Sequence, residues 1–159
     1  MSTSVRATGG RLARDLVRIS AVFLLVSLAA TGSLRAADPE DAAEVALGQT
    51  VYQEACASCH GANLEGQPNW RMRLDNGRLP APPHDATGHT WHHPDPLLFE
   101  ITKQGVEAFA PEGYESDMPG FADSLSDEEI WAVLAFIKSS WPPAIRDRQA
   151  AITRRFANQ

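Results

Sequence analysis

The pentapeptide Cys56-Ala57-Ser58-Cys59-His60 is the feature that most limits what this chain can fold into, and its two cysteines are the only ones in the sequence. A structural zinc site usually needs four ligands, and no second cysteine pair is present to complete one. A thioredoxin-type redox pair follows a strand in a βαβ unit, and no strand pattern precedes this motif. The C-x-x-C-H spacing is instead the signature of covalent haem attachment, with the thiols bonded to the haem and the histidine on its iron.

Residues 1–36 have the pattern of a signal peptide. Arginines precede a 12-residue apolar run, Ile19–Ala30, which is short for a membrane span, and small residues follow it. We expect cleavage between about residues 32 and 37, with the position after Gly32 fitting the small-x-small pattern, and export to the periplasm. An uncleaved membrane anchor is the alternative, and membrane contact is expected only in that case.

Charge limits the partners of the exported chain. Beyond residue 36 the sequence has 9 basic and 19 acidic residues, a net charge of −10. Such a surface repels nucleic acid and anionic lipid. It suits a redox protein that docks through a basic patch, and it does not define an oligomeric state.

Two segments carry clear helix signals. Residues 41–57 place Gly48, Val51, Tyr52 and Ala55 on one face, with Asp38 or Asp41 as the N-cap. A later helix begins with a capping box of Ser126 and Glu129, and Pro142-Pro143 ends it.

A third helix is expected to begin at Asp95, with Asp95 as N-cap and Pro96 in the first turn. Leu97, Leu98 and Ile101 would pack it against the core, and Gly105 would close it.

With these helices in place, the sequence Cys-Ala-Ser-Cys-His-Gly and the later Met118-Pro119-Gly120-Phe121 make residues 42–140 resemble class I c-type cytochromes. The resemblance implies an all-α cytochrome c fold over residues 37–143, wrapped around one covalent haem. It also implies that the first and last helices cross through a small residue, for which Gly48 against residues 131–136 is the candidate. Residues 144–159 form a tail, either a short helix or a frayed end.

The resemblance also implies the site. Haem is expected on Cys56 and Cys59, with His60 and Met118 as iron ligands, because cytochromes c use His/Met ligation. Met72 is the poorer candidate, since it follows His60 by only 12 residues. A proline carbonyl, of Pro82 or Pro83, is expected to orient His60. Four further residues either face the haem propionates or form a solvated basic loop: Trp70, Arg71, Arg73 and Arg78.

Four histidines in ten residues remain to be explained: His84, His89, His92 and His93. One could be a distal iron ligand, or several could bind copper or zinc. We expect instead that they satisfy backbone groups in their own loop.

The sequence therefore predicts an electron carrier rather than an enzyme, acting alone or as a haem subunit of a larger oxidoreductase. The alternatives are a haem enzyme or sensor with an open sixth iron position, such as a peroxidase, and a metal-binding module built on the His84–His93 loop.

The signal peptide gives the first testable prediction. N-terminal sequencing of the exported protein should find a first residue between Ser33 and Asp38, because the small residues after the apolar run are the cleavage signal. Recovery of Ser2 at the N-terminus of protein from a membrane fraction would contradict cleavage and support the anchored form.

Overall fold

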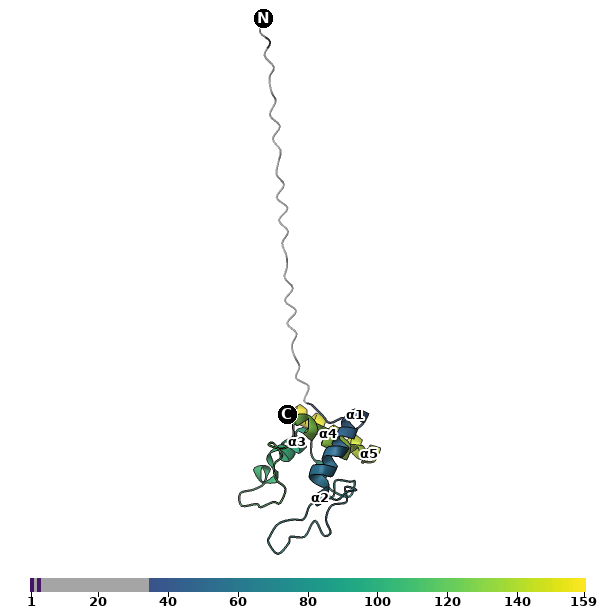
Figure 1. Cartoon of the computed structure of the whole chain (residues 1–159), viewed down its shortest axis with the longest axis vertical. Coiled ribbons are helices and arrows are strands. Elements are labelled where there is room, and N and C mark those ends of the chain that lie inside the picture. The colour runs from purple at the N-terminus through teal and green to yellow at the C-terminus, as the bar shows by residue number, and fades with distance from the viewer. Residues whose placement is uncertain (2, 4–34) are drawn as a thin grey trace. The chain divides into compact units, whose positions relative to one another are not determined.

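Helices and loops make up the described part of the chain, and no strand occurs between residues 35 and 159. The computed structural model describes residues 1, 3 and 35–159, so nearly all of the predicted signal peptide lies outside the described residues. The elements are α1 (Ala42–Val51), the π-helical turn η1 (Tyr52–Cys56), α2 (Ala57–His60), the 3₁₀ turn η2 (Thr90–His92), α3 (Asp95–Gln104), the 3₁₀ turn η3 (Val106–Phe109), α4 (Asp127–Ser139) and α5 (Pro143–Ala157) (Figure 1). The predicted all-α fold class is confirmed. No helix in this part of the chain has the length and apolarity needed to cross a membrane.

The first helical segment runs from α1 through η1 into α2 without a gap. Asp41 caps it, since its carboxylate accepts hydrogen bonds from the N–H groups of Ala43 and Glu44 at 2.9 and 3.1 Å. The predicted helix is confirmed, and of the two candidate caps the structure selects Asp41. The π-helical turn was not predicted. A π turn holds one more residue than an α turn, so it rotates the residues that follow it around the helix axis. It ends at Cys56, the first residue of the predicted haem-attachment motif.

α1 crosses α4 at Gly48. A methyl group on Gly48 would lie 1.9 Å from the carbonyl oxygen of Ala132 and 2.9 Å from Cβ of Phe136, so the two helices touch through their backbones. Only a residue without a side chain allows this approach. The predicted crossing of Gly48 against residues 131–136 is confirmed, although α5 rather than α4 is the last helix.

α4 is the central helix of the core. It begins with the predicted capping box: Ser126 Oγ accepts from the Glu129 N–H at 3.3 Å, and the Glu129 carboxylate accepts from the Ser126 N–H at 2.8 Å. That second bond lowers the pKa of Glu129. One side of α4 packs on α3, and the other packs on α1 and η1. The α4 residues buried in these contacts are Ile130, Trp131, Val133, Leu134, Ala135 and Ile137.

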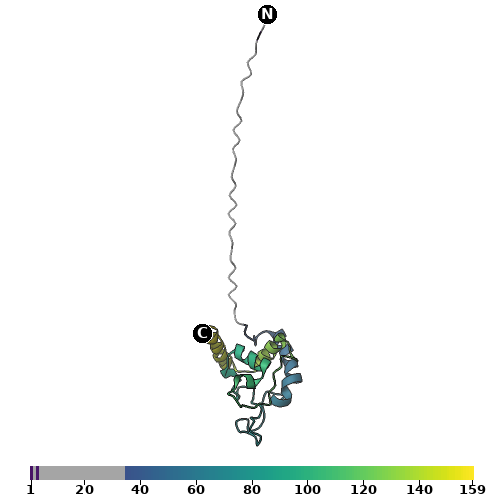
Figure 2. The ribbon, with the colours of Figure 1, turned by 90° about the vertical axis from the view of Figure 1, so that its left-hand side faces the viewer.

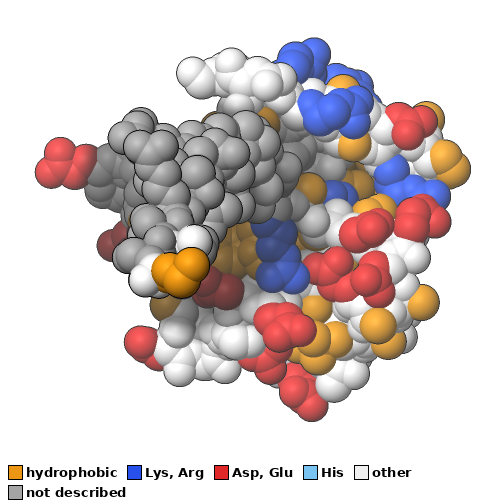
Figure 3. Space-filling view, turned by 90° about the horizontal axis from the view of Figure 1, so that it is seen from above, with side chains coloured by type: hydrophobic (Ala, Val, Ile, Leu, Met, Phe, Trp, Pro, Cys, Tyr) orange, Lys and Arg blue, Asp and Glu red, His pale blue; other side chains and the backbone are white. Residues whose placement is uncertain are grey.

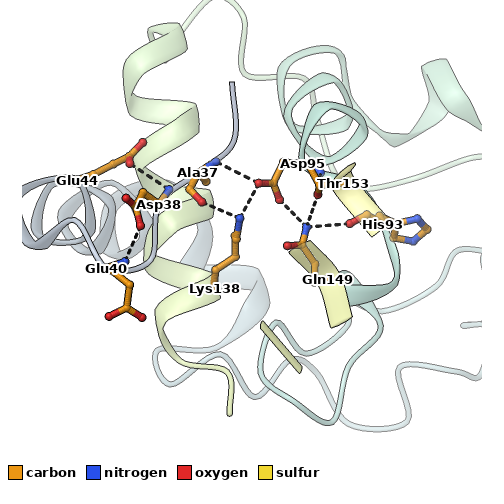
Figure 4. Close-up of polar contacts among 9 residues, drawn as sticks. All are labelled: Ala37, Asp38, Glu40, Glu44, His93, Asp95, Lys138, Gln149 and Thr153. Carbon is orange, nitrogen blue, oxygen red and sulfur yellow. Dashed lines mark hydrogen bonds and ion pairs between the residues drawn. The ribbon is translucent and has the colours of Figure 1, made fainter. Parts of the chain in front are cut away.

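Asp95 does not have its predicted role as the N-cap of α3. Pro94 is the N-cap, and Asp95 is the first helical residue with a fully buried side chain. Its carboxylate accepts from Lys138 Nζ at 2.5 Å, from the Ala37 N–H at 3.1 Å and from Gln149 of α5 at 2.5 Å (Figure 4). A buried charge is tolerated only when it is paired and hydrogen-bonded, so this tertiary network takes the place of local capping.

The tail beyond residue 143 is the helix α5, which lies along one side of the domain (Figure 2). Thr153 is buried, and its Oγ1 accepts from the Asp95 N–H at 3.0 Å. Arg146 pairs with Glu40 at 2.7 Å on the surface, and the face seen in Figure 3 shows acidic and basic side chains close together. The helical alternative for the tail is therefore the one observed.

Gly48→Ala should lower the free energy of unfolding by about 1–3 kcal/mol, because the added methyl group forces α1 away from α4. Denaturant unfolding of the holoprotein measures this change. Ala46→Leu is the control, since Ala46 is exposed on the same helix and its replacement should change stability by no more than about 0.5 kcal/mol. Equal stability of the two variants would contradict a direct backbone contact.

Asp95→Asn should lower the free energy of unfolding by about 3–5 kcal/mol, because it leaves the buried Lys138 ammonium without its counter-charge. Combining it with Lys138→Met removes the stranded charge and should recover a large part of the loss. Both are measured by denaturant unfolding. If the double variant were no more stable than Asp95→Asn, the loss would come from packing rather than from the ion pair.

Candidate functional site

The cysteine motif lies at the end of the first helical segment, near α2 in Figure 1. Cys56 is half-buried and Cys59 is exposed. The segment ends at Gly61, whose φ of +84° is in the left-handed region that favours glycine. Tyr52, which is buried in η1, donates a hydrogen bond from its hydroxyl to the Gly61 carbonyl at 2.9 Å. This bond ties η1 to the turn that follows the motif.

His60 is buried and oriented by a backbone carbonyl. Its Nδ1 lies 2.8 Å from the carbonyl oxygen of Pro82. A carbonyl can only accept, so Nδ1 carries the proton and Nε2 keeps a free lone pair for a metal. Burial lowers the pKa of His60, and the bond to Pro82 partly offsets that effect. Of the two prolines predicted as candidates, the structure selects Pro82.

A cavity of about 590 Å³ opens beside the motif. Both thiols and His60 line it, and so does Met118 from the loop between η3 and α4. Its volume is in the range of cofactor sites, which are mostly apolar with a few placed polar groups. α3 and α4 contribute part of the apolar wall: Leu98, Ile101, Val133, Leu134 and Ile137.

The residues at this cavity fit a haem. Two thiols on one helical segment can form the thioether bonds, and an imidazole with a free Nε2 is the usual proximal ligand. A thioether sulfur at the same cavity is the sixth ligand found in cytochromes c. The apolar wall would supply the contacts that a flat macrocycle needs. These observations assign the cavity to the predicted cofactor, and the role of each ligand remains a prediction.

The two methionines differ in position. Met72 is 67% exposed and does not line the cavity, whereas Met118 is half-buried and does. The loop of Met118 is fastened to the end of α3, since the Phe121 N–H donates to the Thr102 carbonyl at 3.1 Å. Gly120 allows this approach, because a methyl group there would lie 2.7 Å from the backbone of Gln104. The cavity therefore favours Met118 over Met72.

The four histidines of the loop do different things. His84, His89 and His93 line the cavity, whereas His92 is exposed and packs on Trp91 at a centroid distance of 3.8 Å. His84 stacks on His60 with ring centroids 4.0 Å apart. Its nitrogens therefore lie beside those of His60 rather than across an iron from them, which argues against His84 as the distal ligand. Between residues 35 and 159 no group of three or more His, Cys, Asp or Glu side chains is arranged to hold a metal ion.

The basic loop is tied to the rest of the cavity mouth. Arg78 forms ion pairs with Asp117, next to Met118, and with Glu115 at 3.4 Å. These carboxylates raise the pKa of the Arg78 guanidinium. Arg71 lies over the Trp70 ring at 4.2 Å. Pairing of these arginines with haem propionates stays a prediction.

Sequence reasoning missed the contacts that surround His60. Tyr52 was predicted only as part of an apolar helix face, yet its hydroxyl holds the Gly61 turn, and burial raises its pKa. His84 was predicted as a backbone-satisfying residue, and its stacking on His60 has no local signal. Burial lowers the pKa of His84 well below its usual value, and the nearby His60 adds to the effect. The only sign of these contacts in the sequence was the large number of polar and aromatic residues in the loop that contains His84.

Burial, and after it the neighbouring Cys59, raises the pKa of the Cys56 thiol to about 11. The thiolate is the reactive form of cysteine, so Cys56 is mostly protonated at neutral pH.

Comparison with known proteins agrees with this geometry. The family model described as Cytochrome c matches residues 45–141. The cytochrome bc1 complex cytochrome c subunits of Mycobacterium bovis and Mycobacterium tuberculosis are each 28% identical to the chain over 124 residues. The alignments cover 63% of this chain and 43% of each relative, so the chain spans less than half the length of these relatives. No solved structure matches the chain.

The denatured protein should keep its haem through acid-acetone extraction, because thioether bonds to Cys56 and Cys59 survive loss of the fold. Spectra of the extracted protein and of the solvent phase measure the distribution of haem. Replacing both cysteines by alanine should abolish accumulation of the holoprotein, whereas Ser58→Ala, an exposed position between them, should accumulate like the parent. Haem that extracts freely from the parent would show that the attachment is not covalent.

Proposed function

Since this chain belongs to the cytochrome c family, we propose that it is a periplasmic carrier of single electrons with one haem, bound covalently through Cys56 and Cys59. Its iron is ligated by His60 and Met118. The observation that carries the proposal is the His60 ring, whose Nδ1 is committed to the Pro82 carbonyl at 2.8 Å while Met118 lines the same cavity. These two residues would supply both protein ligands of the iron and would leave no coordination position for a substrate.

The residues around the haem would influence its reduction potential and limit the movement of its ligands. Haem iron takes up and releases one electron, and its potential depends on the axial ligands and on burial. The Pro82 carbonyl holds the His60 ring and raises its basicity. Met118 supplies a soft thioether, which raises the potential. The apolar residues of α3 and α4 would pack against the macrocycle, and the two fastened loops would limit ligand movement between oxidation states.

The charges near Met118 also indicate what kind of partner would dock. No lysine or arginine occurs between Lys103 and Lys138, and the segment just before Met118 carries four acids: Glu107, Glu112, Glu115 and Asp117. Arg78 pairs with the last two of these. We propose that a redox protein docks here through a basic patch, as the net charge suggests. Because the named relatives are subunits of a cytochrome bc1 complex, work as a haem subunit of a larger assembly is part of the proposal.

The competing function is a haem enzyme with an open sixth position, and Met118 variants distinguish the two. In the parent, carbon monoxide should leave the optical spectrum unchanged, because both axial positions are taken. Met118→Ala should open one position and create carbon monoxide binding. Met118→His should keep low-spin iron and lower the reduction potential, because imidazole favours ferric iron more than a thioether does.

Met72→Ala is the matched control, because Met72 is exposed and lies outside the cavity lining; its spectrum and potential should equal those of the parent. A parent that itself binds carbon monoxide readily would favour the enzyme or sensor. A parent-like spectrum and potential in Met118→Ala would show that Met118 only packs in the cavity.

A further inference from the structure

The histidine loop, residues 84–93, places His84 at the cavity beside His60, the proposed iron ligand. Electron transfer by itself does not require a histidine at this position. The His84 ring lies against the face of the His60 ring, with centroids 4.0 Å apart and an interplanar angle of 26°. The Tyr52 ring lies edge-on to the His84 ring, with centroids 6.3 Å apart and an interplanar angle of 75°. His60 therefore has an aromatic neighbour on its face as well as a hydrogen bond at its edge.

His84 is itself held by three hydrogen bonds. Its N–H donates to the Leu64 carbonyl at 2.8 Å, and its carbonyl accepts from Trp141 Nε1 at 2.7 Å. Its ring Nδ1 lies 2.8 Å from Oγ1 of Thr90, a residue that is 6% exposed. Leu64 and Trp141 are buried as well. Both the backbone and the ring of His84 are fixed, so the surface it presents to His60 is rigid.

The two contacts of His60 restrain different motions. The hydrogen bond to Pro82 fixes the direction in which Nδ1 points, but the ring can still turn about an axis close to that bond. A flat, rigid ring against its face blocks that turn. The plane of an axial imidazole determines how its orbitals overlap with those of the metal, and interactions beyond the direct ligands are known to tune metal sites.

We propose that His84 is a positioning residue for His60, fixing the plane of the iron-binding imidazole by stacking on its face, with Thr90 holding the His84 ring in place. This inference rests on the proposed function, because it takes His60 to be the iron ligand. It gives the histidine loop a role in the haem site that needs no second metal.

The test is electron paramagnetic resonance of the ferric holoprotein together with its reduction potential. His84→Ala removes the stacking surface, so the low-spin g features should move and broaden as the His60 plane becomes variable, and the potential should shift. His84→Phe keeps a flat ring against His60 but loses the bond to Thr90, so its g features should move less than those of His84→Ala. Thr90→Val leaves His84 in place but frees its ring, and should move the g features in the same direction as His84→Ala, to a smaller extent.

His92→Ala is the control, because His92 belongs to the same loop but is exposed and does not line the cavity. Its g values and potential should equal those of the parent. Parent g values in His84→Ala would overturn the inference, and so would equal changes in His84→Ala and His84→Phe. If His84→Ala does not accumulate, His84→Phe and Thr90→Val decide: g features unmoved in Thr90→Val would overturn it. A parent without a low-spin ferric signal would instead contradict the ligand set of the proposed function.

Discussion

The arrangement of the site depends on the backbone contact between α1 and α4 at Gly48. There is no room for a side chain at Gly48, since a methyl group would lie 1.9 Å from the Ala132 carbonyl oxygen. This approach brings η1 and α2, with both cysteines and His60, alongside the α4 residues that wall the cavity. Without the approach, the attachment motif and the apolar wall would not face the same space.

The remaining elements close the cavity around that crossing. Backbone hydrogen bonds fasten the loop of Met118 to the end of α3. The ion pair of Arg78 with Asp117 links the same loop to the basic loop that contains Arg78. α3, α4 and α5 are in turn joined by the buried carboxylate of Asp95, which contacts Lys138 and Gln149 (Figure 4). Removing such ion pairs is costly because the charge left behind is buried. His60 and Met118, the two proposed iron ligands, are therefore supported by separate parts of the fold.

Features set by neighbouring residues could be read from the sequence, and those set by distant residues could not. The Asp41 cap and the Ser126 capping box depend on residues three positions apart and were predicted correctly. Asp95 was assigned to a cap because nothing local reveals its partner Lys138, 43 residues away. The choice of Pro82 over Pro83 and the stacking of His84 on His60 likewise depend on how a loop of irregular structure folds back on the motif.

The central claim is that Met118 is the sixth ligand of the haem iron. It is tested in one NMR spectrum by ¹³C-methyl methionine labelling of the reduced, diamagnetic holoprotein. Beyond the start codon the sequence has two methionines, and the exposed Met72 serves as an internal reference. The Met118 methyl resonance should be moved far upfield by the haem ring current, while that of Met72 should stay near its ordinary position. Ordinary positions for both methyl groups, or an upfield shift of Met72 alone, would contradict it.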